Sequence, residues 1–534
     1  MNTHSHAKAN DFLSGVSLSV PTLALAWGWP TAVVVGLTLT VLVLIWAAYR
    51  TNYPRIANIP EAPGSLPFVG HLPFLGGRLG VNDADIFSRW SRQLASGIYQ
   101  IKLGYQRTVI VSSWAVMEEL FVSKNSSMLD RVHQHGFSDY IGLDISGSSL
   151  TPDVKKCRAA AVRALGKSMW PRYYKLIEPD SVQFITKIYQ SGKNGQVPLE
   201  TYPWLRQIMF NLALHMTYGI RVGDFDPELA TKLLNSLNVI TECRGSTTEY
   251  RHYVPLLRMW PWSKSKLIAA AQERNRCAKV LHEQYRRKAE QGKAPDCLVS
   301  SMRSERLTPD ELFGTCMSIL QAAPDTVSSS TYQCMAWLSS APGQAFQEEC
   351  LENILEVYDG DRDRAWDMAF QEEKVPLLVS LYKETLRFYA TSAFNMRRTS
   401  REVTVGDTTT LPKGVGVTMN IRGVNHDPDH YGPDALAFNP KRFLGDTSSH
   451  LPHLTFGTGS RICPAYMIAN RIIYAMLVRL ILAFRLKEVP GTRLPSIGRL
   501  DFSDVMGLIA VPRAYDCAFT ARDDAWLKDK LAVE

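Results

Sequence analysis

The sequence predicts a mainly α-helical protein with a small β portion, preceded by one membrane-spanning helix at the amino terminus. Three observations lead to this expectation. Most of the chain has helical hydrophobic periodicity, short stretches alternate between apolar and polar residues, and no charged residue occurs between Phe12 and Tyr49. The 534 residues are 46% hydrophobic and 21% charged, which is an ordinary composition for a large globular domain.

The amino-terminal helix is predicted from the run TAVVVGLTLTVLVLIWAA, Thr31 to Ala48. About 20 apolar residues suffice to cross a bilayer. Arg50 and Arg55 follow the run and only Lys8 precedes it, so the positive-inside rule places the amino terminus in the lumen and the remainder in the cytosol. A cleaved signal peptide is the alternative, although the run is long for one and no small-x-small cleavage site follows.

These features divide the chain into a lumenal tail (1–29), a transmembrane anchor (30–49), a proline-rich segment (50–75) and one large domain (76–534). Four prolines stiffen the third part, which we expect to act as a rigid hinge, with an ordinary surface loop as the alternative. No further linker divides the remainder, so we expect one domain there.

Within the large domain, Gly97 to Ser112 alternates around a glycine-containing turn and predicts a β-hairpin. Short strands are expected between Val403 and Met419. The clearest helices are predicted at Leu307 to Ser340, Val375 to Tyr389 and Pro464 to Phe484. The first of these begins with the capping-box pair Thr308 and Glu311.

The charge and cysteine content narrow the classes of function. A net charge of +8 is modest for this size and fits an anionic membrane surface or an acidic protein partner. No basic patch with interleaved aromatic residues occurs, so nucleic acid is not an expected partner. The nine cysteines are scattered without a zinc or disulfide spacing, which is typical of reduced thiols in a cytosol-facing domain.

The strongest motif is FGTGSRIC, Phe456 to Cys463. Its glycines allow a tight turn and close approach to a flat ligand, and the cysteine is delivered to the start of a helix, whose free N–H groups stabilise a thiolate. Arg461 is suitably charged to bind an anionic group. The alternative is a buried structural cysteine beside an unrelated loop.

At these residues the sequence resembles the cytochrome P450 superfamily, whose signature Phe-x-x-Gly-x-Arg-x-Cys-x-Gly matches at Phe456, Gly459, Arg461 and Cys463. Ala465 replaces the last glycine, and we expect a slight shift in helix packing there. The resemblance implies the cytochrome P450 fold with haem b as cofactor, Cys463 as the axial ligand of the haem iron and Arg461 at a propionate.

Two further motifs follow the order of this family. Glu384 and Arg387 match Glu-x-x-Arg, and Arg442 lies in FNPKRF, which resembles the Pro-x-Arg-Phe region. The resemblance implies that these three residues form a buried ion network. A solvated helix pair is the alternative for Glu384 and Arg387.

The segment AAPDT, Ala322 to Thr326, resembles the oxygen-activation motif of the family. It implies that Thr326 and Asp325 serve oxygen activation, Thr326 by hydrogen bonding and Asp325 by relaying protons. Ala323 replaces the usual glycine, and Pro324 predicts a kink. The alternative is a structural kink with a solvated aspartate and a threonine bonded back to its own helix.

Haem propionates have further candidate partners. Arg158 falls where the family usually has Trp-x-x-x-Arg, but the tryptophan is absent. Arg397 or Arg398 is a similar candidate after the Glu384 helix. The alternative for each is a surface charge.

The resemblance extends to fungal microsomal members, particularly the phenylacetate-hydroxylase-like group with its secondary-metabolite enzymes, through His252 to Arg258 and Ala469 to Arg471. It implies a monooxygenase of the endoplasmic reticulum membrane that inserts oxygen from O2 into, or oxidatively couples, an apolar aromatic small molecule. No flavin or nicotinamide segment follows the haem loop, so an NADPH-dependent cytochrome P450 reductase is expected in trans. An isomerase or dehydratase that needs no O2, or a non-catalytic haem sensor, remains the alternative.

The resemblance implies a substrate pocket built from three segments, Arg131–Ile145, Leu320–Thr326 and Ser392–Asn395. They contribute five apolar candidates, Phe137, Tyr140, Ala322, Ala323 and Phe394, which suit a ring better than a charged ligand. His133, His135 and Asn395 are the polar candidates that orient a substrate.

Overall fold

The structure, a computed structural model, describes residues 29–133, 140–224, 226–243, 247, 250–255, 257, 264–445, 452–505 and 508–533. The chain forms two compact units, Met1–Arg50 and Thr51–Glu534. The described part of the first unit is helix α2 (Trp29–Tyr49), with its described side chains exposed, so the predicted amino-terminal helix is present. Among the described helices, α19 (Tyr466–Ala483) is long and apolar enough to cross a membrane, but 83% of its residues are buried inside the second unit. The described apolar stretch of α2 is shorter and covers Thr31–Trp46.

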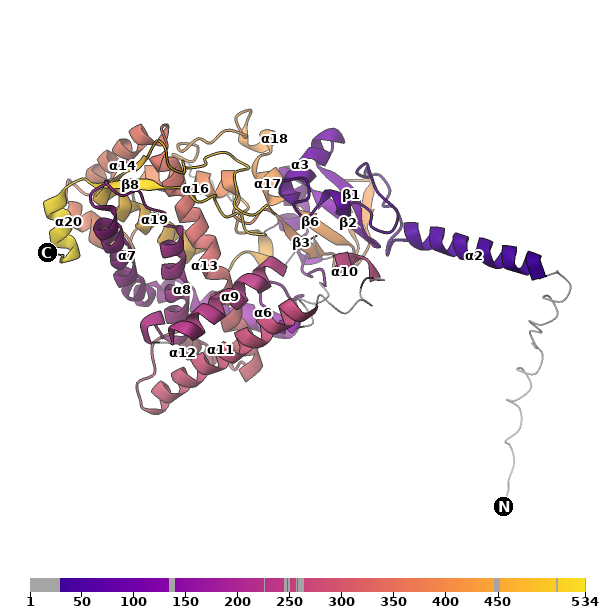
Figure 1. Cartoon of the computed structure of the whole chain (residues 1–534), viewed down its shortest axis with the longest axis horizontal. Coiled ribbons are helices and arrows are strands. Elements are labelled where there is room, and N and C mark those ends of the chain that lie inside the picture. Colours follow the sequence, from indigo (N-terminus) through magenta and orange to yellow (C-terminus); the bar gives the residue numbers. More distant parts are fainter. Residues whose placement is uncertain are drawn as a thin grey trace, which may run out of the picture. The chain divides into compact units, whose positions relative to one another are not determined.

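The second unit contains one four-stranded sheet in the order β1-β2-β6-β3 (Figure 1). Strands β1 (Ile98–Leu103) and β2 (Gln106–Val111) form the predicted antiparallel hairpin. Strand β6 (Gly416–Met419) runs parallel to β2 and antiparallel to β3 (Asn395–Arg398). Two-stranded sheets pair β4 (Val403–Val405) with β5 (Thr409–Leu411), and β7 (Phe484–Glu488) with β8 (Cys517–Ala521).

Helices make up most of the second unit, as predicted. The α-helices that precede the longest one are α3 (Asp83–Gln93), α4 (Trp114–Met117), α6 (Pro152–Ala164), α7 (Trp170–Gly192), α8 (Tyr202–Tyr218), α9 (Pro227–Cys243), α10 (Tyr250–Tyr253), α11 (Lys264–Glu290) and α12 (Leu298–Met302). The others are α13 (Pro309–Ser339), α14 (Gly343–Val357), α15 (Arg362–Met368), α16 (Pro376–Tyr389), α17 (Ile421–Asn425), α18 (Pro428–Tyr431), α19 and α20 (Asp524–Leu531). A π-helical turn covers Glu118–Ser123, and short 3₁₀ turns cover Leu72–Phe74, Asn125–Ser127, Lys167–Met169, Val222–Asp224, Arg303–Glu305 and Gly459–Arg461.

Helix α13 begins where its capping box predicts. The Thr308 hydroxyl accepts a hydrogen bond from the Glu311 N–H at 3.2 Å, and the Glu311 carboxylate accepts one from the Thr308 N–H at 2.7 Å. The helix continues through Pro324 and is capped at Ser340. Gly343 then opens α14 so close to α13 that an added Cβ would lie 2.0 Å from the Trp337 carbonyl oxygen. This contact forces the chain to turn between the two helices.

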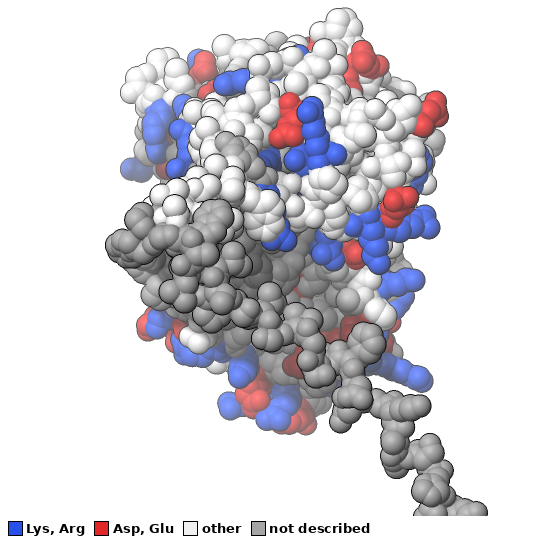
Figure 2. All heavy atoms as spheres, turned by 90° about the vertical axis from the view of Figure 1, so that its right-hand side faces the viewer, with Lys and Arg blue, Asp and Glu red and all other residues white. Residues whose placement is uncertain are grey.

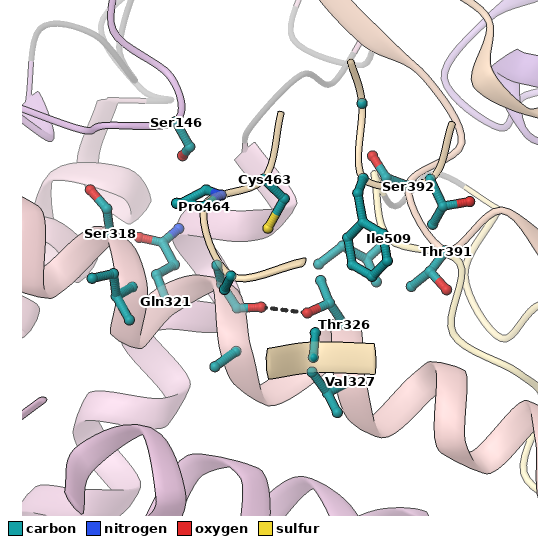
Figure 3. Close-up of a pocket in the computed structure, with 18 of the residues that line it drawn as sticks. Ser146, Ser318, Gln321, Thr326, Val327, Thr391, Ser392, Cys463, Pro464 and Ile509 are labelled. Atoms are coloured by element: carbon teal, nitrogen blue, oxygen red, sulfur yellow. Dashed lines mark hydrogen bonds between the residues drawn. The ribbon is translucent and has the colours of Figure 1, made fainter. Parts of the chain in front are cut away.

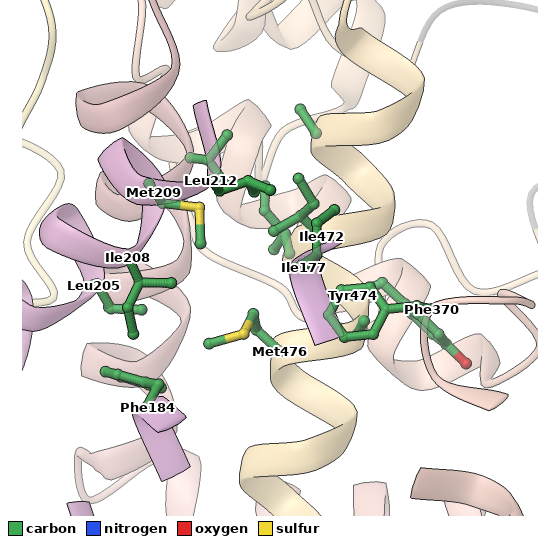
Figure 4. Packing of buried hydrophobic residues seen from close by; sticks show 14 of the residues in the cluster. Ile177, Phe184, Leu205, Ile208, Met209, Leu212, Phe370, Ile472, Tyr474 and Met476 are labelled. Atoms are coloured by element: carbon green, nitrogen blue, oxygen red, sulfur yellow. The ribbon is translucent and has the colours of Figure 1, made fainter. Parts of the chain in front are cut away.

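The main hydrophobic core lies among α7, α8, α13, α16 and α19. Figure 4 shows Ile472 and Met476 of α19 facing Ile177 of α7 and Leu212 of α8. Because α19 is apolar around most of its circumference, it packs against several helices at once. This packing anchors the helix that follows the FGTGSRIC loop.

Residues 51–75 of the proline-rich segment, which stays a predicted hinge, belong to the second compact unit. Ile56 is 6% exposed and Leu72 is fully buried. The Gln100 amide of β1 donates hydrogen bonds of 2.9 Å to the carbonyls of Ile56 and Ile59. The prolines therefore stiffen a segment that is packed onto the domain.

Charged side chains are mixed on the face of the molecule shown in Figure 2. Lys and Arg side chains lie among Asp and Glu side chains and many uncharged residues. Such mixing agrees with the modest net charge of the sequence.

Candidate active site

A cavity of about 360 Å³ lies between α13 and the loop that carries Cys463 (Figure 3). Its wall also takes residues from α8, α19, the segment after α16, and the segments around Ser146 and Ile509. The sequence motifs that lie far apart in the chain therefore meet at one enclosed space.

The loop directs the Cys463 side chain into this cavity. Gly457 and Gly459 adopt positive φ angles of 71° and 64°, which glycine tolerates without a steric penalty. The Cys463 N–H donates a 2.9 Å hydrogen bond to the Phe456 carbonyl, which closes the turn. A Cβ at Gly459 would lie 2.7 Å from the Phe121 carbonyl oxygen, so this position also requires glycine for space.

The Cys463 thiol is partly exposed within the cavity, whereas seven of the nine cysteines are buried. Burial raises the pKa of this thiol, while a hydrogen bond from the Ala465 backbone and the charge of Arg158 lower it. A coordinated metal ion deprotonates a thiol outright. Cys463 therefore lies beside two groups that favour the thiolate.

Three buried arginines lie together beside the loop. The Arg158 guanidinium donates to the Ile145 and Ile462 carbonyls at 2.9 and 2.8 Å, and Arg461 donates to the Ser148 carbonyl at 2.7 Å. The guanidinium of Arg397 donates to the Met128 and Thr458 carbonyls at 3.1 and 3.2 Å.

The electrostatics of these arginines favour an anion. Burial, followed by repulsion from Arg461 and Arg158, lowers the pKa of Arg397 to about 9, and its Nε atom is buried without a hydrogen-bond partner in the described part of the structure. A ligand with two carboxylates would neutralise this excess positive charge. Haem b carries two propionates, so the arginines together with Cys463 fit that cofactor.

A fourth arginine lies at the start of the first segment that was expected to form the pocket. Arg131 lines the cavity and donates to the Met396 carbonyl at 2.9 Å and to the Asn395 side chain. It belongs to none of the motifs, and these two partners of its guanidinium lie more than 250 positions away in the chain. The tertiary structure therefore decides what this side chain contacts.

Only part of the AAPDT segment of helix α13 faces the cavity. Ala322, Ala323 and Thr326 line the wall, and the Thr326 hydroxyl donates a 2.8 Å hydrogen bond to the Ala322 carbonyl. Asp325 is not among the residues lining the cavity; it pairs with Arg206 of α8 at 2.5 Å. The threonine thus faces the reaction space, and the aspartate lies behind it.

Glu384 and Arg387 of α16 form a fully buried, bidentate ion pair at 2.7 and 2.8 Å. Arg387 also donates to the carbonyls of Asn425, Ala435 and Ala437 at 2.7, 2.8 and 3.1 Å. The guanidinium of Arg442 lies 3.2 Å from Glu384 and 2.9 Å from Asp434. The three residues join α16 to the chain segment that leads toward the cysteine loop.

The pocket candidates are only partly brought together. Phe394 lines the cavity, but its ring packs edge-on against Phe87, at a centroid distance of 6.1 Å. Asn395 also lines the cavity and accepts the Arg131 hydrogen bond. Tyr140 and His133 are exposed and are not among the lining residues. Phe137 and His135 lie outside the described residues.

The described cavity wall is richer in hydroxyl and amide groups than the sequence led us to expect. It contains Thr241, Gln321, Ser330, Thr391 and Ser392 in addition to Thr326. Gln321 and Ser392 lie in segments that were expected to form the pocket. Thr241, Ser330 and Thr391 are ordinary polar positions in the sequence, so only the fold identifies them as part of the site.

The cytochrome P450 family model matches residues 60–510, so the chain belongs to the cytochrome P450 family. It is 27% identical to phenylacetate 2-hydroxylase from Emericella nidulans, over 90% of this chain and 94% of that protein. It is 25% identical to 3-hydroxyphenylacetate 6-hydroxylase from the same organism, over 89% and 92% of the two chains. A zebrafish cytochrome P450 solved with abiraterone shares the fold, with a TM-score of 0.67 at 18% identity, over 83% of this chain and 100% of that one.

The protein is therefore a cytochrome P450 monooxygenase with haem b as its cofactor. It uses O2, a redox partner and a small-molecule substrate. The charge and position of the arginine cluster and of Cys463 fit this cofactor.

Proposed function

We propose that this monooxygenase inserts oxygen into an aromatic small molecule, from a cytosolic domain anchored in the endoplasmic reticulum membrane by α2. The observation that carries the proposal is the single cavity onto which the Cys463 thiol and the Thr326 hydroxyl both open. An NADPH-dependent cytochrome P450 reductase, acting in trans, supplies the electrons.

The aromatic substrate is supported by two relatives whose names specify phenylacetates. Both alignments cover about nine-tenths of the chain. Small alanines on α13 leave room for a ring next to Thr326, and Phe394 and Ile509 add apolar surface.

Cys463 would hold the haem at its iron, and Arg158, Arg397 and Arg461 would hold its propionates. When bound, the haem supplies the electron-transfer and dioxygen chemistry, and thiolate donation favours O–O cleavage. Glu384, Arg387 and Arg442 fix the chain segment that precedes the loop, so the cysteine stays in position.

Thr326 and Asp325 handle protons. The Thr326 hydrogen is directed to the Ala322 carbonyl at 2.8 Å, so the Oγ1 lone pairs are available to accept a proton donor in the cavity. Asp325, whose side chain is 15% exposed, is held behind Thr326 by its ion pair with Arg206. We expect protons to reach Thr326 from behind the helix by this route, so the cavity need not open to bulk water.

The membrane assignment rests on composition. Helix α2 has 21 residues, none of them charged, and Arg50 follows it directly. Such a helix is long enough for the hydrocarbon core of a bilayer, and the following cation favours the cytosolic side.

The proposal is tested with the full chain reconstituted in vesicles with a fungal reductase. Phenylacetate, hydroxyphenylacetate, lauric acid and limonene are scored by the Soret shift and by product mass. We expect hydroxylated products from the aromatic acids. Exclusive turnover of lauric acid or limonene would contradict the aromatic assignment.

The haem ligand is tested separately. Cys463→Ala should abolish the thiolate-type Soret band of the reduced carbon monoxide complex, whereas Cys243→Ala, at another partly exposed cysteine, should keep it. A thiolate-type band that persists in Cys463→Ala would overturn the assignment.

A further inference from the structure

Most hydroxyl groups in the cavity wall already have a hydrogen-bond partner. Thr326 donates to Ala322, and the Ser318 hydroxyl donates to the Gly314 carbonyl at 2.7 Å while it accepts from the Ile145 N–H at 3.1 Å. The hydroxyls of Ser330 and Thr391 lie 2.9 Å apart and pair with one another. These groups are satisfied within the protein.

Ser392 differs from its neighbours. Its side chain lines the cavity, and within the described part of the chain its hydroxyl makes no hydrogen bond. Its backbone is nevertheless held in place, because Ser392 forms a β-bridge with Ile509 and the Ala510 N–H donates to the Thr391 carbonyl at 2.8 Å. A fixed backbone carrying an uncommitted hydroxyl is preorganised to bind a ligand.

A second polar group lies on the other side of the reaction centre. Figure 3 shows Gln321 on one side of Cys463 and Thr326, and Ser392 on the other. The Gln321 amide nitrogen makes one long contact of 3.5 Å with the Thr241 hydroxyl, whose hydrogen is directed to the Leu237 carbonyl at 2.9 Å. The Gln321 carbonyl oxygen remains as an acceptor facing the cavity side of α13.

We propose that Ser392 and Gln321 recognise two polar groups at opposite ends of the substrate ring. Gln321 accepts a hydrogen bond from a phenol or an N–H group, and Ser392 donates one to a carbonyl or carboxyl oxygen. The ring between them packs against Ala322, Val327 and Phe394. This inference rests on the proposed aromatic substrate and narrows it to a ring with two polar substituents.

The physical reason for selectivity is the cost of unpaired polar groups. A substrate that lacks one substituent leaves Ser392 or Gln321 desolvated without a partner in a closed site. Sites built in this way discriminate against analogues that lack the matching group more strongly than apolar pockets discriminate by size.

The test uses four probes of similar size on the holoenzyme: para-hydroxyphenylacetamide, phenylacetamide, para-ethylphenol and ethylbenzene. Dissociation constants are measured by the Soret absorbance change. Ser392→Ala should raise the dissociation constants of the two amides by about twofold to tenfold and leave those of para-ethylphenol and ethylbenzene unchanged. Gln321→Met should raise the dissociation constants of the two phenols by a similar factor and leave those of phenylacetamide and ethylbenzene unchanged.

Thr391→Val is the matched control, because it removes a neighbouring hydroxyl that is already bonded to Ser330. It should change all four constants by one common factor. If Ser392→Ala and Gln321→Met also act uniformly on all four probes, or have no effect, the two polar contacts are wrong while the aromatic substrate stands. If none of the four probes perturbs the Soret band and lauric acid does, the aromatic substrate itself is wrong, and the inference falls with it.

Discussion

Glu384→Gln is expected to destabilise the fold by removing the counter-charge of two arginines. Glu384 and Arg387 are both fully buried. The Glu384 carboxylate accepts two hydrogen bonds from Arg387, at 2.7 and 2.8 Å, and one from the Asn439 N–H at 2.8 Å. The Arg442 guanidinium lies 3.2 Å from the same carboxylate. Removing one partner of a buried ion pair leaves an uncompensated charge and costs about 3–5 kcal/mol. Glutamine has nearly the same shape as glutamate, so the loss of stability measures the effect of removing the charge.

Asp434→Asn is the matched control. Asp434 also pairs with Arg442, at 2.9 Å, but its side chain is 50% exposed. An exposed pair contributes about 1 kcal/mol or less. Adding Arg387→Met to Glu384→Gln removes the stranded charge as well, so the double variant should lose less stability than the two single losses added together.

The assay is urea unfolding of the haem-saturated protein, followed by far-ultraviolet circular dichroism and by the Soret band. Haem is kept at the same saturation in each variant, because ligand binding adds to apparent stability. Equal unfolding midpoints for Glu384→Gln and Asp434→Asn would refute the reasoning, as would a strictly additive double variant.

Three further predictions concern proton handling and pH. Thr326→Ala should retain haem but release more peroxide per product, because a proton acceptor at the cavity is lost. Thr326→Ser keeps the hydroxyl and should keep peroxide release low. Low peroxide release in both variants would exclude a role of Thr326 in proton delivery. Arg206→Leu removes the cation that holds the Asp325 carboxylate behind Thr326 and should lower the product formed per electron consumed, whereas Arg206→Lys keeps a cation there and should preserve most of it. Identical coupling in the two variants would mean that the ion pair does not matter. Burial lowers the pKa of His453 from 6.5 to about 3. The unfolded chain therefore binds more protons as the pH falls from 6.5 toward 3, and stability is lost over this window by up to about 1.4 kcal/mol per pH unit. In urea titrations at several pH values, His453→Gln should reduce the dependence of the unfolding free energy on pH, whereas the exposed control His133→Gln should not. An unchanged pH dependence in His453→Gln would contradict this prediction.

Several elements could be predicted because their causes are local. The long helix was expected over Leu307 to Ser340 and spans Pro309–Ser339, since its capping box and the turn after it act within a few residues. The hairpin of β1 and β2 and the cysteine loop were predictable for the same reason. Glycine, proline and capping residues restrict the backbone wherever they occur.

The proline-rich segment shows where local reasoning stops. Its prolines predict a stiff chain, but stiffness does not say what the chain contacts. The Gln100 side chain, 44 residues away from Ile56, binds the carbonyls of this segment and holds it on the sheet. Residues 51–75 thereby became part of the domain.

By itself, the sequence determined the chemistry of this protein: a cysteine at a glycine-rich turn before a helix, a threonine on a long helix, and a Glu-x-x-Arg pair. Only the tertiary structure decided which neighbouring side chains serve the site. Arg397 and Arg398 are adjacent in β3 and point to opposite faces of the strand. The pairing of Arg397 with Val417 of β6 turns Arg397 inward, toward Arg461 and Arg158. Such a choice depends on strand register with a distant segment, and no local pattern in the chain encodes it.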